Sequence, residues 1–167
     1  MIHQILKSSY NSQSPIFIKN CLNINLLWED VFNLLDTITE KNLNFEIHNH
    51  LLSLTILHGF FDNKIHDGAK FLSLYEIQPN KIYSAHVYAN LSKYAKTFGK
   101  HKDNVDVFYL QAIGKTKWEI EGHGEYLLDV GDLIYCPKNI YHTVTSLSPR
   151  VGISYGIKDE ELTNQST

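Results

Sequence analysis

The fold of this chain is decided by TFGKHKDNVDVFYLQAIGKTKW at residues 97–118 and VGDLIYCPKNIYHTV at residues 130–144. In both stretches, short runs of β-branched and aromatic residues alternate with Gly, Pro and Asn, which favour turns. Runs of this kind cover residues 82–88, 105–113, 116–120, 126–128, 133–136, 142–145 and 151–157. Short strands spaced so closely by tight turns predict a small antiparallel barrel or a double-sheet jelly roll.

The first half of the chain has a mixed pattern. Apolar residues recur at helical spacing over residues 26–39, with Asn25 as the expected N-cap and with Glu29 and Asp30 near the positive end of the helix. Strands are predicted at residues 15–19, 45–47 and 51–57, and a second helix at residues 67–77. We therefore expect a single domain over residues 1–167, with a helix-and-strand lead-in at 1–80, a barrel core at 81–157 and a polar tail at 158–167.

Composition excludes several classes of protein. The 167 residues contain 15 Lys and Arg against 18 Asp and Glu, a net charge of −3, which disfavours a phosphate-binding footprint for nucleic acid. The most apolar window, residues 51–61, is shorter than the roughly 20 residues that span a bilayer. The N-terminus lacks the pattern of a signal peptide, and the two cysteines are too few for a disulfide scaffold. These features predict a cytoplasmic protein that binds neither nucleic acid nor membrane.

Three residues in the deciding stretches have the chemistry of a metal site. His101 and Asp103 are two positions apart, so on an extended strand their side chains project to the same face. If that face is the lumen of the barrel, His142 completes a set of two imidazoles and one carboxylate. This facial set holds Fe(II) and leaves coordination positions open for other ligands.

The pair is followed by an ordered set of further residues. They are Asp106-Val107-Phe108, Gln111, Gly114 and Trp118, then Gly131-Asp132, Tyr135 and Pro137 ahead of His142. In order and spacing this set resembles the JmjC-type branch of the cupin superfamily, in particular the ribosomal-oxygenase-like and asparaginyl-hydroxylase-like oxygenases. The resemblance covers residues 82–157, nearly half of the chain. It implies a mainly β fold, the cupin double-stranded β-helix or jelly roll, with helices from the N-terminal half packed outside it.

The resemblance also implies a ligand set. His101, Asp103 and His142 would bind Fe(II) and form the catalytic centre, with 2-oxoglutarate as cosubstrate and O2 as oxidant. Tyr88 matches the strand from which the family offers a tyrosine hydroxyl to the cosubstrate. The family places Lys or Arg two positions after the glycine, where this chain has Thr116.

Three interpretations of Thr116 stay open at this point. The cosubstrate binds through Thr116, Tyr88 and Tyr109, or a β-bulge turns Lys117 inward, or the protein does not use 2-oxoglutarate. Strand alternation would otherwise point Lys117 away from the lumen.

The function that this resemblance implies is hydroxylation of a peptide or protein side chain, or of an amino-acid-like small molecule. The alternatives are a metal-dependent cupin enzyme without 2-oxoglutarate, motivated by Thr116, and a non-catalytic cupin that binds a small ligand or a partner. The sequence leaves the substrate and the oligomeric state open, a homodimer being one option. It also leaves open whether Fe(II), Mn(II), Ni(II) or Zn(II) occupies the site in the purified protein.

Overall fold

The computed structural model describes residues 2–40, 45–48, 53–56 and 82–157. Two helices, α1 (Ile2–Asn11) and α2 (Trp28–Glu40), belong to the N-terminal part, with the short strand β1 (Ile16–Ile18) between them. The other strands in these ranges are β2 (Phe45–His48), β3 (Ser53–Ile56), β4 (Ile82–Asn90), β5 (Asp106–Ile113), β6 (Thr116–Ile120), β7 (Gly124–Leu128), β8 (Leu133–Cys136), β9 (His142–Ser146) and β10 (Arg150–Ile157). β-Strands therefore dominate the described part of the chain.

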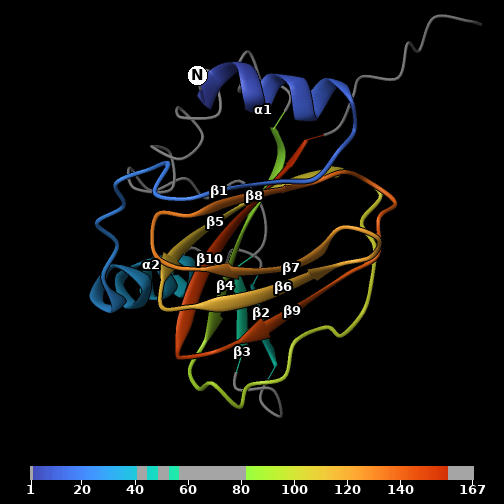
Figure 1. The fold of residues 1–167 in the computed structure, drawn as a ribbon. Helices are drawn as coiled ribbons and strands as arrows, with labels where there is room; N and C mark the ends of the chain where they lie inside the picture. Colours follow the sequence, from blue (N-terminus) through green and yellow to red (C-terminus); the bar gives the residue numbers. More distant parts are fainter. Residues whose placement is uncertain (1, 41–44, 49–52, 57–81, 158–167) are drawn as a thin grey trace, which may run out of the picture.

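The strands form two antiparallel sheets. A seven-stranded sheet has the order β1-β8-β5-β10-β4-β3-β2, and a three-stranded sheet has the order β7-β6-β9. The smaller sheet faces the larger one, and α1 crosses one end of the larger sheet (Figure 1). This double-sheet arrangement confirms the predicted jelly roll. The N-terminal strands β1, β2 and β3 extend the larger sheet at its two edges.

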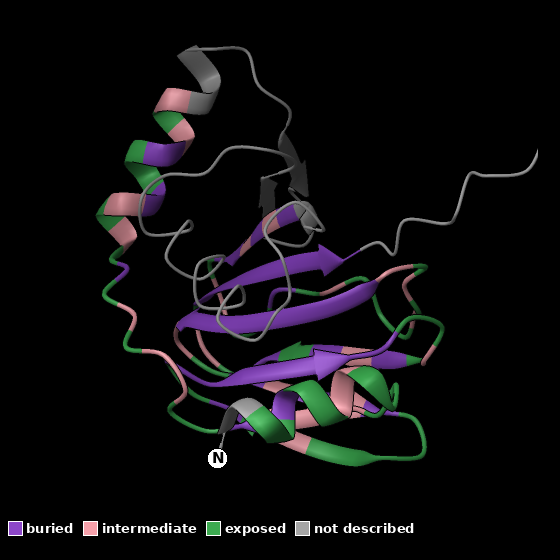
Figure 2. Ribbon diagram, turned by 90° about the horizontal axis from the view of Figure 1, so that it is seen from above, coloured by how far each residue is buried: buried purple, intermediate pink, exposed green. Residues whose placement is uncertain are grey.

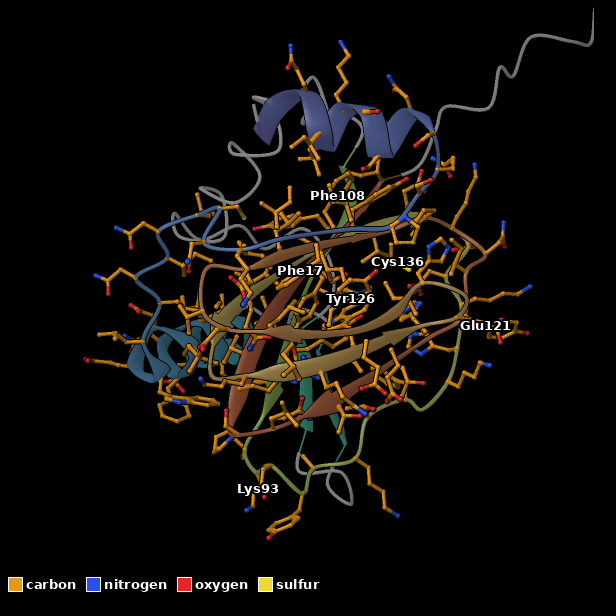
Figure 3. The ribbon with its side chains drawn as sticks, viewed as in Figure 1. Phe17, Lys93, Phe108, Glu121, Tyr126 and Cys136 are labelled. Atoms are coloured by element: carbon orange, nitrogen blue, oxygen red, sulfur yellow. The ribbon has the colours of Figure 1, made fainter. Side chains whose placement is uncertain are left out.

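Alternation along the central strand β5 separates two hydrophobic clusters. Phe108 and Leu110 point to a cluster that includes Leu6 of α1 and Val31 of α2, whereas Tyr109 points to a cluster between the sheets. The central strands of the larger sheet are buried along their length (Figure 2). In Figure 3, Phe108 lies toward α1, and Phe17 and Tyr126 lie between the sheets, with ring centroids 5.7 Å apart. The helices thus cover one face of the larger sheet and leave its other face to form the lumen.

The segment before α2 is hydrogen-bonded to the turn between β7 and β8. The main-chain oxygen of Gly131 accepts hydrogen bonds from the amides of Cys21 and Leu22 at 3.0 and 3.2 Å. Asp132 is 2% exposed, and its carboxylate accepts from the amides of Asn20 and Asp129 at 2.8 and 2.9 Å. Gly131 has φ +87° and lies against the carbonyl of Leu22, so a side chain there would meet both strain and a clash.

The predicted strands are confirmed with small shifts at their ends, and two details of the N-terminal part differ. Asn25 is not the N-cap of α2: the helix begins at Trp28, and the Asp30 carboxylate accepts from the Leu27 amide at 2.7 Å. Helix α1 was not predicted, because its ten residues are largely polar and the packing of Leu6 is what buries it. The helix predicted at residues 67–77 lies outside the described residues.

Candidate metal centre

The structure brings the three predicted metal-binding side chains together. Candidate ligand atoms of His101, Asp103 and His142 all lie within 4.8 Å of one another. Asp103 Oδ2 is 3.5 Å from His142 Nε2, and the centroids of the two imidazole rings are 4.4 Å apart. Two imidazole nitrogens and a carboxylate oxygen on one side of a shared space are a donor set that suits a divalent transition-metal ion.

Backbone hydrogen bonds hold these residues in place. His142 begins β9, and His101 pairs with it in an isolated antiparallel bridge with N–H···O distances of 3.0 and 2.8 Å. The main-chain oxygen of Asp103 accepts from the amide of Asn139 at 2.8 Å. The segment from His101 to Asp103 is outside the named strands, so it is this pairing, rather than a long strand, that directs both side chains to one place.

Each imidazole ring is oriented through its Nδ1 atom. His101 Nδ1 is 2.9 Å from the carbonyl of Gly99, and His142 Nδ1 is 3.1 Å from the carbonyl of Ile140. A ring that donates its Nδ1 proton to a carbonyl leaves the Nε2 lone pair available to a metal ion. Burial lowers the pKa of His142 below its ordinary value of 6.5, which favours the neutral ring that a metal requires. The residues present therefore fit a metal ion.

The site opens into a cavity of about 120 Å³ between the two sheets. This volume would hold about ten water molecules, which is the size of a small organic ligand. The cavity wall comprises the three residues above together with His86, Tyr88, Thr97, Phe98, Val105, Val107, Tyr109, Trp118, Val144, Arg150, Ser154 and Gly156. Trp118 stacks on His142 with ring centroids 5.1 Å apart, and its buried Nε1 has no hydrogen-bond partner in the described part of the chain. A ligand or a water molecule in the cavity would satisfy this donor.

Two of the predicted cosubstrate residues line this cavity. Tyr88 lies on β4, and its hydroxyl is 3.0 Å from His86 Nδ1. Tyr109 lies on β5 and is 2% exposed. The Tyr109 hydroxyl donates to Gln111 Oε1 at 3.1 Å and accepts from Arg150 Nη1 at 2.6 Å.

Thr116 and Lys117 occupy different places from these tyrosines. Thr116 is fully buried but does not line the cavity, and its hydroxyl donates to Gln111 Oε1 at 2.8 Å. Lys117 points to the outside of the smaller sheet, where its ammonium lies 3.1 Å from Glu119 and 3.7 Å from Glu125. The interpretation in which a β-bulge turns Lys117 inward is wrong, because β6 pairs with both β7 and β9 in unbroken register.

Arg150 is the site residue that sequence reasoning missed. It begins β10, is 4% exposed and lines the same cavity as the metal-binding set. The residues directly beside it, a proline before and a valine after, do not distinguish an inward-facing arginine from one at an exposed strand end. A signal was available in the alternation of Arg150, Gly152 and Ser154 with the apolar residues of β10, which indicates that this arginine shares the lumen face.

Comparisons with known proteins identify a similar family and similar folds. The JmjC domain family matches residues 64–125. Among solved structures, the chain superposes on YcfD, a ribosomal oxygenase from Escherichia coli, in complex with cobalt and 2-oxoglutarate. The TM-score is 0.68 at 18% identity, over 90% of this chain and 50% of that one. The chain shares the fold of this oxygenase, and part of its sequence matches the JmjC domain family.

A second structural neighbour of this chain is a prolyl-4-hydroxylase from Pseudomonas putida, with a TM-score of 0.66 at 9% identity, over 95% of this chain and 100% of that one. The chain spans about half the length of the YcfD structures. The search of curated proteins found no match. In the described ranges, no helix is long and apolar enough to cross a membrane.

Proposed function

We propose that this protein is an Fe(II)- and 2-oxoglutarate-dependent oxygenase. Its substrate would be a peptide or protein side chain, or an amino-acid-like small molecule, which it would hydroxylate. The observation that carries the proposal is the convergence of His101, Asp103 and His142 beside a ligand-sized cavity. The JmjC match and the fold shared with two oxygenases support it. We further propose that the chain forms one such domain, with its barrel in residues 81–157.

The protein's own residues would bind and orient the reactants. His101, Asp103 and His142 would hold the metal on one side, with Nε2 of each ring directed by the Nδ1 hydrogen bond to a backbone carbonyl. The bound iron and 2-oxoglutarate would supply an O2-dependent oxidation in which a C–H bond becomes C–OH and 2-oxoglutarate becomes succinate and CO2. Tyr109, Val107 and Trp118 form buried walls of the cavity, so they would exclude bulk water from the reacting groups.

The test is an anaerobic titration of the Fe(II)-loaded protein with 2-oxoglutarate, followed by the visible metal-to-ligand charge-transfer absorption of the chelate. We expect the absorption band in the unmodified protein and its loss in His101→Ala. His123→Ala is the matched control, because His123 is an exposed turn residue outside the cavity. The control variant should titrate like the unmodified protein.

Two results would contradict the proposal. Stoichiometric metal without a band would remove 2-oxoglutarate and favour the metal-dependent cupin without that cosubstrate. Failure of the protein to bind divalent metal would favour the non-catalytic cupin. Metal analysis of the loaded protein separates the two outcomes and reports whether Mn(II), Ni(II) or Zn(II) competes with iron.

A further inference from the structure

Arg150 is a buried cation, and the described residues place no carboxylate within ion-pair distance, 4.0 Å, of it. Its hydrogen bonds in this part of the chain are with two hydroxyls: Nη1 donates to Tyr109 at 2.6 Å and Nε donates to Ser146 at 3.3 Å. A guanidinium has five N–H groups, so these two bonds leave donors to spare. A buried charge without a counter-ion is unfavourable, and a ligand that supplies the opposite charge removes this cost.

Tyr109 cannot be that counter-ion. Burial raises the pKa of the Tyr109 phenol above its ordinary value of 10, although the nearby Arg150 opposes this shift. The phenol therefore stays neutral at physiological pH, and Arg150 keeps a full positive charge. Because Arg150 lines the cavity, an anionic group of a bound ligand would have room beside the guanidinium.

A chain of hydrogen bonds fixes the position of this cation. Gln111 Nε2 donates to the carbonyl of Ile113 at 2.7 Å, which directs Oε1 toward its two donors, the hydroxyls of Thr116 at 2.8 Å and Tyr109 at 3.1 Å. Tyr109 in turn accepts from Arg150. Thr116 is therefore linked to Arg150 through three hydrogen bonds and two intervening residues, Gln111 and Tyr109.

We propose that Arg150 binds the distal carboxylate of the cosubstrate, with Tyr109 and Thr116 as positioning residues. The positive charge that the resemblance places on β6 is supplied in this chain from β10, across the same lumen. Thr116 then contributes to the hydrogen-bond network that positions the arginine and does not itself contact the ligand. This inference rests on the proposed function and goes beyond it, because it names the residue that selects a dicarboxylic 2-oxo acid.

The experiment compares two 2-oxo acids in the anaerobic Fe(II) titration. 2-Oxoglutarate carries the distal carboxylate and 2-oxobutyrate lacks it, while both chelate the metal through the same groups. In the unmodified protein we expect 2-oxoglutarate to bind more tightly, by roughly 10- to 100-fold, the range for a charge-assisted hydrogen bond. Arg150→Met should remove this preference and leave the affinity for 2-oxobutyrate unchanged. Arg150→Lys should retain part of the preference, since it keeps the charge but not the planar fork.

Lys117→Met is the matched control. It removes a cation from the neighbouring strand β6 whose ammonium lies against Glu119 outside the cavity, so the preference should persist. The inference is wrong if Arg150→Met keeps the preference, or if it weakens both acids equally, which would mark a purely structural role. A complete absence of the band for both acids in the unmodified protein would instead overturn the proposed function.

Discussion

Gly152 gives the sharpest test of how the lumen is built. It lies on β10 next to Tyr109, and a Cβ atom at this position would fall well inside van der Waals contact of the Tyr109 hydroxyl and ring. We expect Gly152→Ala to destabilise the protein, because the buried phenol must leave its position and lose its bond from Arg150. Overpacking of a core costs about 1–3 kcal/mol. A hydrogen bond to a charged group is worth about 1.5–3 kcal/mol.

A gain of about 0.4–1 kcal/mol from replacing glycine partly offsets these costs. The expected loss in the free energy of unfolding is therefore about 2–5 kcal/mol, measured by urea denaturation. The melting temperature should fall by about 5–15 °C for a chain of this size.

A double-mutant cycle with Tyr109→Ala isolates the cause. Once the ring is absent, the added methyl group meets open space, so Gly152→Ala should be neutral or slightly stabilising in that background. The two substitutions should therefore couple by more than about 1 kcal/mol. An equal cost of Gly152→Ala in both backgrounds would refute the reasoning, because the strain would then lie in the backbone of β10 rather than in the contact with Tyr109.

Three further outcomes are expected. Asp132→Ala should destabilise the protein by about 2–4 kcal/mol, since two amides lose their buried acceptor, whereas Asp129→Asn at the exposed neighbouring position should change the denaturation midpoint little. The stability of the metal-free protein should fall as pH drops below about 6.5, because burial lowers the pKa of His142 and the unfolded state takes up its proton first. His142→Gln should flatten this slope, which for one group is at most about 1.4 kcal/mol per pH unit. Thr116→Val should reduce the preference for 2-oxoglutarate over 2-oxobutyrate by less than Arg150→Met does, since it removes one bond from Gln111 rather than the charge.

Local patterns predicted most of the strands because each strand is short, apolar and bounded by turn residues. The pairing of these strands was not predictable in the same way. β2 and β3 join the larger sheet through β4, which is separated from β3 by a long stretch of sequence. Helix α1 is absent from the prediction for a related reason. Its stability comes from contacts such as that of Tyr10 with Phe108, at a centroid distance of 5.8 Å, which no local pattern encodes.

The residues of the candidate site also fall into those that the sequence predicted and one that it did not. The two-residue spacing of His101 and Asp103 singled them out as a pair, and the resemblance gave His142 the role of third ligand. The bridge between His101 and His142, rather than a strand, is what brings the side chains together. The sequence also showed that Thr116 replaces the basic residue of the family. It did not show which cation takes over, because the nearest cations in sequence, Lys115 and Lys117, form ion pairs at the surface. Electrostatic compensation depends on distance through space. A cation on any strand that faces the lumen can supply the charge, and Arg150 does so from a strand that begins 34 positions beyond Thr116. A change in one motif position therefore predicts loss of an anion site only after every inward-facing position of the barrel has been considered.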